Sequence, residues 1–174
     1  MKLSPAMERY VLHWGEMGTR WGVNRSVSQI HALLYLVGRP MTAEDIAETL
    51  SIARSNVSTS LKELQNWNLI QVVTVLGDRR DHFEARSDNW EILMIITEQR
   101  KRREIDPTIE MLRQAVAETA NDSETPAEVK ERIASLLGFM ETLTTWYEDV
   151  RKLPRNILVK LLKLGARVGR FVLK

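Results

Sequence analysis

The sequence of 174 residues contains no cysteine, which excludes disulfides, thiolate metal sites and cysteine nucleophiles. That absence fits the reducing cytosol. The N-terminal run MKLSPAMERY lacks the apolar core of a signal peptide, and no stretch approaches the roughly 20 apolar residues of a membrane span. We therefore expect a soluble, cytoplasmic protein with no membrane partner.

Patterns of catalytic residues are absent as well. The three histidines, His13, His31 and His82, show no metal-ligand spacing, and the chain has no serine-histidine-aspartate arrangement, P-loop or glycine-rich phosphate cradle. The net charge is only +2, from 25 basic and 23 acidic residues, so the placement of the charges decides whether nucleic acid binds. The sequence predicts neither an enzyme nor a cofactor or metal.

Apolar residues recur at helical spacing through most of the chain, which predicts a mainly α fold. Ser4 and Pro5 begin a first helix. Ser26 has capping-box spacing to Gln29 and begins a second helix, which ends at the run 38–40, GRP.

Residues 42–66 combine a short helix, a tight turn and a longer helix. Thr42 caps the short helix, the turn lies at Ser51-Ile52, and the longer helix runs from about residue 53 to residue 66. That order and spacing predict a helix-turn-helix.

The hydrophobic period then changes from that of helices to that of strands. Residues 69–76 are rich in β-branched side chains, residues 77–81 form a polar turn, and residues 82–86 return as a second strand. The hairpin predicts a two-stranded β-wing over residues 70–86. Residues 42–86 therefore predict a winged helix-turn-helix.

The remainder of the chain is helical in pattern. Asp106-Pro107 kinks or restarts a helix, and Thr125 has capping-box spacing to Glu128 at the start of another. A last helix over 154–171 is apolar around much of its circumference and has basic edges.

We expect two regions in the chain. The winged DNA-binding domain spans residues 26–87. Residues 1–25 and 88–174 form a helical dimerisation region, because a widely apolar helix left exposed in a monomer usually marks an interface.

The outward face of the helix over 53–66 carries short polar side chains and cations. At 100° per residue, Val57, Leu61 and Leu64 fall on one side, and the centre of the opposite side has no acid. Short polar groups allow close approach to a major groove, where asparagine and arginine contact base edges and lysine reaches a phosphate. The expected DNA-binding residues of this helix are Arg54, Ser55, Asn56, Ser58, Thr59 and Lys62.

The alternative for this face is an ordinary solvated surface. Such surfaces favour glutamate, lysine and glutamine, whereas Ser55, Ser58, Thr59 and Ser60 are poorer helix formers. The composition therefore favours a binding face.

Arg79 and Arg80 lie at the expected tip of the wing. A cationic tip beside a groove-reading helix lies along the DNA backbone or enters a narrowed minor groove. The alternative is a plain solubilising turn.

Several runs resemble the winged helix of MarR-type regulators: TAEDIAETL at 42–50, SIARSNVSTSLKEL at 51–64 and NLI at 68–70. GDRRDHFEARSDNWEI and the later QRKRREIDPTIEMLR resemble the GbsR-like branch of that family. The resemblance implies a homodimeric transcriptional regulator, with repression favoured over activation. It also implies that Arg54 to Lys62 face the groove, and that Asp78 orients the DNA-contacting Arg80.

Three positions depart from the family pattern. Ala53 replaces a capping serine, so the helix that follows starts without a side-chain cap. Asn68 replaces a glycine, which is tolerable because asparagine enters left-handed conformations. His82-Phe83 replaces a basic run, which removes expected contacts between the wing and phosphate.

The tryptophans suggest a small-molecule effector as a further partner. Aromatic faces bind quaternary ammonium groups, and the resemblance points to effectors of the choline or osmoprotectant type. The favoured alternative is that these aromatic residues anchor the core or the dimer interface. The candidates for such a cage are Trp14, Trp21, Trp90 and Trp146-Tyr147, whereas Trp67 is expected to pack the end of the helix over 53–66 against the wing.

The predicted function is a dimeric repressor that reads a pseudo-palindromic site in double-stranded DNA. The helix over 53–66 enters the major groove, and the wing over 70–86 contacts the flanking DNA. The alternative is a winged-helix module that binds a protein partner and does not read DNA.

Overall fold

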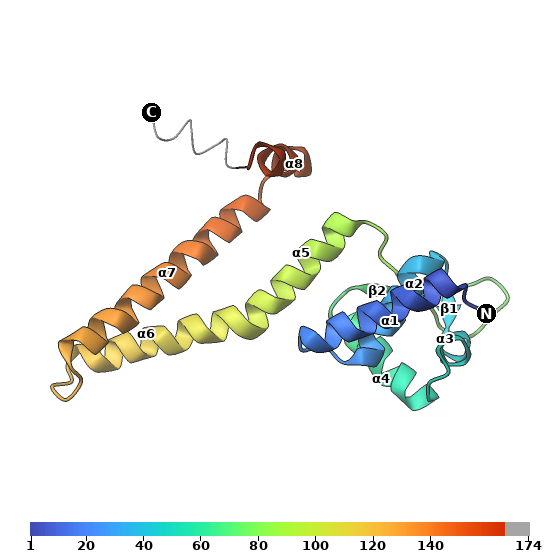
Figure 1. Cartoon of the computed structure of the whole chain (residues 1–174), viewed down its shortest axis with the longest axis horizontal. Helices are drawn as coiled ribbons and strands as arrows, with labels where there is room; N and C mark the ends of the chain where they lie inside the picture. Colours follow the sequence, from blue (N-terminus) through green and yellow to red (C-terminus); the bar gives the residue numbers. More distant parts are fainter. Residues whose placement is uncertain (166–174) are drawn as a thin grey trace. The chain divides into compact units, whose positions relative to one another are not determined.

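The computed structural model describes residues 1–165 of the chain (Figure 1). They form two packing units, one from Met1 to Gln99 and the other beginning at Arg100. The elements of the first unit are α1 (Pro5–Arg20), α2 (Arg25–Val37), β1 (Met41–Thr42), α3 (Ala43–Leu50), α4 (Arg54–Asn66), β2 (Ile70–Val73), β3 (His82–Ala85) and α5 (Asn89–Arg100). Those of the second are a π-helical turn η1 (Lys101–Ile105), α6 (Asp106–Ala120), α7 (Ala127–Arg151) and α8 (Arg155–Leu164).

Helix α2 forms the centre of the first unit. Its Ile30, Leu33 and Leu34 are completely buried, and α1, α3, α4 and the sheet supply the rest of the core. Helix α1 lies close to α2 because Gly15 and Gly18 face it without side chains. Residues 1–25 therefore pack on the winged domain, in addition to any role in dimerisation.

The sheet has three antiparallel strands in the order β1-β3-β2. Phe83 of the central strand pairs with Met41 on one side and with Val72 on the other. The predicted mainly α fold with a winged helix-turn-helix is confirmed, but the sheet gains a strand beyond the expected two. The extra strand has only two residues, which is too short for a strand period to show in the sequence.

The helix starts agree with the sequence patterns in two cases and differ in two. Ser4 caps α1, and Thr42 forms a full capping box with Asp45 at α3. The prediction that Ser26 caps the second helix was wrong, because the side chain of Asn24 accepts the Ser26 N–H instead. The capping box at Thr125 was also wrong: Thr125 bonds to Asp122, and α7 begins after Pro126 with no side-chain cap.

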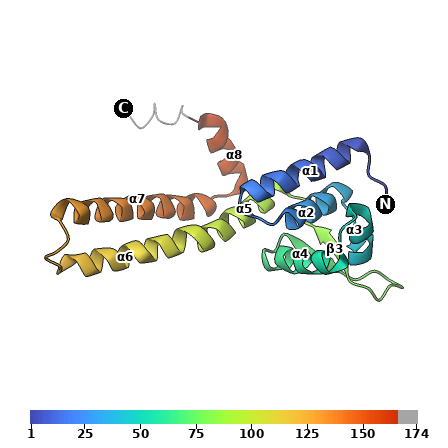
Figure 2. The same cartoon turned by 60° about the horizontal axis from the view of Figure 1, so that its bottom comes forward.

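The second unit is built on an antiparallel pair of long helices, α6 and α7, which lie side by side in Figure 2. Pro107 stands in the first turn of α6, directly after the π-helical turn η1, so the chain continues in helical form where a kink or restart was expected. The predicted last helix is described to Leu164, and its remaining residues, 166–171, lie outside the described part of the chain. Among residues 1–165, no helix is both long and apolar enough to cross a bilayer.

Candidate nucleic-acid interface

Helix α4, hereafter the recognition helix, is held by its apolar face and leaves its polar face open. Val57, Leu61 and Leu64 are buried in the core. The six predicted DNA-binding residues of the helix are all exposed: Arg54, Ser55, Asn56, Ser58, Thr59 and Lys62. Ser60 was wrongly counted with the outward polar residues, because it is only 2% exposed and lies on the packed side.

The turn between α3 and the recognition helix fixes the orientation of one helix relative to the other. Ser51 ends α3 with a left-handed backbone at φ 53°, and the N–H of Ile52 donates to the carbonyl of Ala47 over 3.1 Å. The side chain of Ile52 packs against the core, so both the backbone and the side chain of this residue hold the turn in place. This geometry presents the first turn of the recognition helix at the surface.

The first turn of the recognition helix has no side-chain cap, as the alanine at position 53 predicted. An uncapped helix N-terminus presents backbone N–H groups and the positive end of the helix dipole, both of which favour a phosphate. Arg54 at this end forms an ion pair with Glu44 of α3. Its side chain is 74% exposed, so it is held near the surface without being buried.

Asn56 lies on the exposed polar face of the recognition helix, and a hydrogen bond fixes its side chain. Its Nδ2 donates a hydrogen bond to Oγ of Ser26, 2.8 Å away in the first turn of α2. One amide hydrogen and the amide oxygen remain for a ligand, which is the combination that recognises adenine in the major groove. Ser26 was expected only as a helix cap, and its role beside Asn56 depends on the packing of α2 against α4.

The tip of the wing, Asp78 to Arg80, carries a fixed arginine. The Arg80 side chain donates to both oxygens of Asp78, from Nε over 3.0 and 3.1 Å and from Nη2 over 2.5 Å. The backbone N–H of Arg80 also donates to Asp78 Oδ1 over 3.0 Å. These bonds hold the pKa of Asp78 well below its usual value and raise that of Arg80. Arg79 is exposed beside them.

The base of the wing depends on Arg86, which sequence reasoning assigned only to the end of a strand. Its Nε donates to the backbone carbonyl of Asn68 and its Nη2 to Asn68 Oδ1, each over 2.7 Å. Its Nη1 pairs with Glu91 of α5 at 2.6 Å. Asn68 adopts the expected left-handed backbone, with φ 59°. Arg86 thus joins the end of the recognition helix, the wing and α5.

Comparison with known proteins relates part of the chain to a family of regulators. The model of the MarR family matches residues 21–81. The HTH-type transcriptional repressor GbsR of Bacillus subtilis strain 168 is 21% identical over 140 residues, which cover 79% of this chain and 77% of the relative. These matches support a DNA-binding transcriptional regulator of the MarR type.

A solved structure shares the fold of this chain. A crystal structure of a transcriptional regulator superposes with a TM-score of 0.57 at 18% identity and covers 83% of this chain and 95% of its own. The likeness extends over a larger share of the chain than the family match to residues 21–81.

Three aromatic residues of α1 and its C-terminal end contact one another within the first unit. On α1, the Trp14 ring lies 5.9 Å from the rings of both Tyr10 and Trp21, in tilted and edge-on contacts. These rings contact one another, which favours an apolar contact surface over a ligand cage. Trp67, at the end of the recognition helix, packs against the core. Trp146 is 64% exposed on α7, in the other unit.

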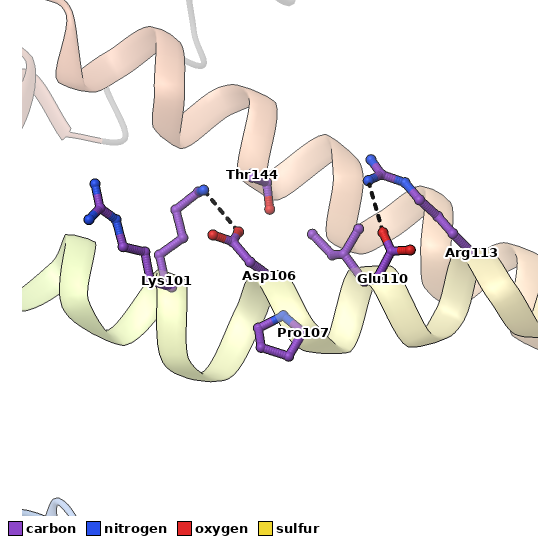
Figure 3. Close-up of a pocket in the computed structure, with 8 residues that line it drawn as sticks. Lys101, Asp106, Pro107, Glu110, Arg113 and Thr144 are labelled. Carbon is purple, nitrogen blue, oxygen red and sulfur yellow. Dashed lines mark hydrogen bonds and ion pairs between the residues drawn. The ribbon is translucent and has the colours of Figure 1, made fainter.

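Within the second unit, a shallow groove lies between η1 with the first turns of α6 on one side and α7 near Thr144 on the other (Figure 3). Its charged side chains already have partners. Lys101 Nζ lies 2.9 Å from Asp106 and 3.4 Å from Glu148, and Arg113 Nη2 lies 2.8 Å from Glu141. The Lys101–Glu148 pair joins η1 to α7 and the Arg113–Glu141 pair joins α6 to α7, so we assign these charges a structural role. Among the described residues, no three acidic or histidine side chains lie close enough to hold a metal ion.

Proposed function

We propose that this regulator is a dimeric repressor that binds a pseudo-palindromic DNA site. The recognition helix enters the major groove, and the wing tip contacts the flanking backbone or minor groove. The observation that carries the proposal is the polar face of the recognition helix, exposed along its whole length and preceded by an uncapped helix N-terminus. The proposed contacts are those of Arg54, Ser55, Asn56, Ser58, Thr59, Lys62, Asp78, Arg79 and Arg80.

The outer face of α7 supports the dimer. Its exposed apolar residues are spaced seven, three, four and three residues apart, which keeps them at the a and d positions of a coiled coil. A second copy of the chain is the occupant that this self-complementary pattern fits, and an isologous contact gives the two-fold symmetry of a palindromic site. The residues of this stripe are Val129, Leu136, Phe139, Leu143 and Trp146.

Substitutions on the stripe test the dimer. Phe139→Glu places a charge at the centre of the stripe and is expected to convert the dimer into a monomer in analytical ultracentrifugation. Thr145→Glu, on an exposed position away from the stripe, is the matched control and leaves the dimer intact. A wild-type chain that sediments as a monomer contradicts the dimer.

Selection of random duplexes with the purified full-length protein tests the DNA-binding function. We expect enrichment of one sequence with two inverted half-sites, centred one helical turn apart or a multiple of it. Failure to enrich any sequence, combined with affinity for a protein partner, would establish the alternative of a winged-helix interaction module.

A small-molecule effector is a further element of the proposal. The aromatic cluster of Tyr10, Trp14 and Trp21 is its best candidate site, through attraction between a quaternary ammonium group and the ring faces. Titration of the protein with choline or glycine betaine, followed by tryptophan fluorescence and by DNA affinity, tests it. A saturable change in both signals supports an effector of this class, and no change excludes it.

A further inference from the structure

His82 occupies a buried position directly behind the wing tip. It is the first residue of the central strand β3, where it pairs with Thr42 of β1 and with Val73 of β2. The residue is only 8% exposed. The family pattern expects a basic run here that contacts phosphate, but burial keeps this imidazole away from DNA.

Both ring nitrogens of His82 face oxygen acceptors of the wing tip. Nδ1 lies 3.0 Å from the backbone carbonyl oxygen of Arg80, and Nε2 lies 3.5 Å from Asp78 Oδ2. A carbonyl and a carboxylate accept hydrogen bonds and do not donate them. The ring therefore faces an oxygen acceptor on each side.

The Asp78 carboxylate is contacted by two side chains. Arg80 binds both of its oxygens from the solvent side, and the ring of His82 approaches Oδ2 from the buried side. Two further acids, Glu44 and Asp45 of α3, act on the Arg80 guanidinium electrostatically. Without a second contact on Asp78, the carboxylate could follow Arg80 into other rotamers or release it toward α3.

We propose that His82 is a positioning residue of the DNA-binding wing. Its ring holds the Asp78 carboxylate and the Arg80 carbonyl, so that the guanidinium of Arg80 is presented to DNA in one orientation. This inference rests on the proposed function, because Arg80 must contact DNA for its orientation to matter. His82 itself touches no DNA, and its effect passes entirely through Arg80.

Two substitutions separate positioning from core packing. His82→Leu keeps an apolar volume in the sheet but removes both ring nitrogens, whereas His82→Gln restores an N–H donor near the position of Nε2. Thermal unfolding identifies a variant that fails to fold. A role in packing alone predicts that the leucine variant binds DNA as the wild type does.

The experiment measures the affinity of the full-length protein for its selected duplex, with each substitution made alone and combined with Arg80→Ala. We expect His82→Leu to weaken binding roughly tenfold, the effect of about 1.4 kcal/mol, and His82→Gln to recover most of the loss. In the Arg80→Ala background, His82→Leu should have no further effect. Equal binding by the leucine variant, or equal weakening in both backgrounds, overturns the inference.

A second measurement on the free protein keeps this result distinct from a failure of the proposed function. The Arg80 Nε–H signal in NMR should be protected from exchange in the wild type and in His82→Gln, and lose protection in His82→Leu. Unchanged protection overturns the positioning of Arg80 by His82, whatever the affinity for DNA. A wild-type protein with no duplex affinity overturns the proposed function. It also overturns the role of His82 in DNA binding, even where protection changes as expected.

Discussion

Asn56 of the recognition helix donates a hydrogen bond to Ser26 of α2, over 2.8 Å between Nδ2 and Oγ. The bond joins a side chain on the exposed polar face of the recognition helix to α2, which forms the centre of the core. It restrains the rotamer of Asn56 and directs its amide oxygen away from Ser26. The Asn56 side chain is therefore held in position in the protein without DNA.

Removal of the Ser26 hydroxyl should weaken specific binding through Asn56. Asn56→Ala is expected to lose roughly 1–3 kcal/mol of discrimination at one base pair, and Ser26→Ala a smaller part of it, about 0.5–1.5 kcal/mol. Fluorescence anisotropy with the selected duplex and with single-base variants measures both losses.

Ser26→Thr keeps the hydroxyl and serves as the control for this pair. Equal affinities of wild type and Asn56→Ala for every duplex would remove Asn56 from the reading surface. Additive losses in the double variant would show that Ser26 acts independently of Asn56.

The close approach of α1 and α2 predicts a large cost for one added methyl group. A Cβ at Gly18 would lie 1.9 Å from Oγ of Ser28, so the two helices must separate. We expect Gly18→Ala to lower the free energy of unfolding by about 1–3 kcal/mol, measured by urea denaturation.

Gly138 is the matched control within α7. No atom lies within 4 Å of a Cβ added there, and alanine favours a helix interior by about 0.5–1 kcal/mol over glycine. Gly138→Ala should be neutral or stabilising. A Gly18→Ala variant as stable as the wild type would contradict the packing described for α1.

Much of the interface follows from local patterns, because its main elements are long or carry distinctive residues. Val57, Leu61 and Leu64 mark the packed side of the recognition helix by their spacing, and Ala53 reveals the missing cap by its lack of a polar group. Asp78 and Arg80 are two residues apart, so their contact needs no tertiary information.

The features that sequence reasoning missed depend on contacts between distant residues. Arg86 binds Asn68, and Asn56 binds Ser26. The members of each pair lie too far apart in the sequence for a local pattern to reveal the contact. Asn24 and Ser26 are both good caps, and the backbone geometry at Asn24 decides between them. At α7, the Thr125 hydroxyl bonds to Asp122 in the preceding turn and is lost as a cap.

The uncapped recognition helix predicts a stabilising substitution. Ala53→Ser supplies an acceptor for the N–H groups of the first turn and should raise the free energy of unfolding by about 1 kcal/mol. The same side chain competes with a phosphate for those N–H groups. We therefore expect equal or weaker duplex affinity despite the added stability.

The two properties of the Ala53→Ser variant are measured by urea denaturation and fluorescence anisotropy. Ala53→Val, which adds volume without an acceptor, is the control. A serine variant that is less stable than the wild type would contradict the description of this helix start.

Burial of His31 makes the stability of the fold depend on pH. Desolvation lowers the pKa of His31 to about 4, and its Nε2 has no hydrogen-bond partner among the described residues. The side chain is neutral in the folded protein, while the unfolded chain takes up a proton near an ordinary pKa of about 6.5. The folded state therefore loses stability as the pH falls from about 6.5 to 4, by roughly 3 kcal/mol over that window.

Urea denaturation at several pH values tests the role of His31. His31→Leu should flatten the decline between about pH 6.5 and pH 4, and His13→Gln, on an exposed position of α1, should leave it unchanged. Identical pH profiles for the wild type and His31→Leu would show that other groups cause the decline.

The central claim is that the recognition helix and the wing tip bind DNA through their cations. Its most direct test is the salt dependence of affinity for the selected duplex, measured for the wild type, Lys62→Ala, Arg80→Ala and the α1 control Arg9→Ala. We expect affinity to fall steeply between about 50 and 200 mM salt, and the log–log slope to decrease by about one in the Lys62 and Arg80 variants only. Affinity that is insensitive to salt, or slopes for Lys62→Ala and Arg80→Ala equal to that of the wild type, would contradict the claim.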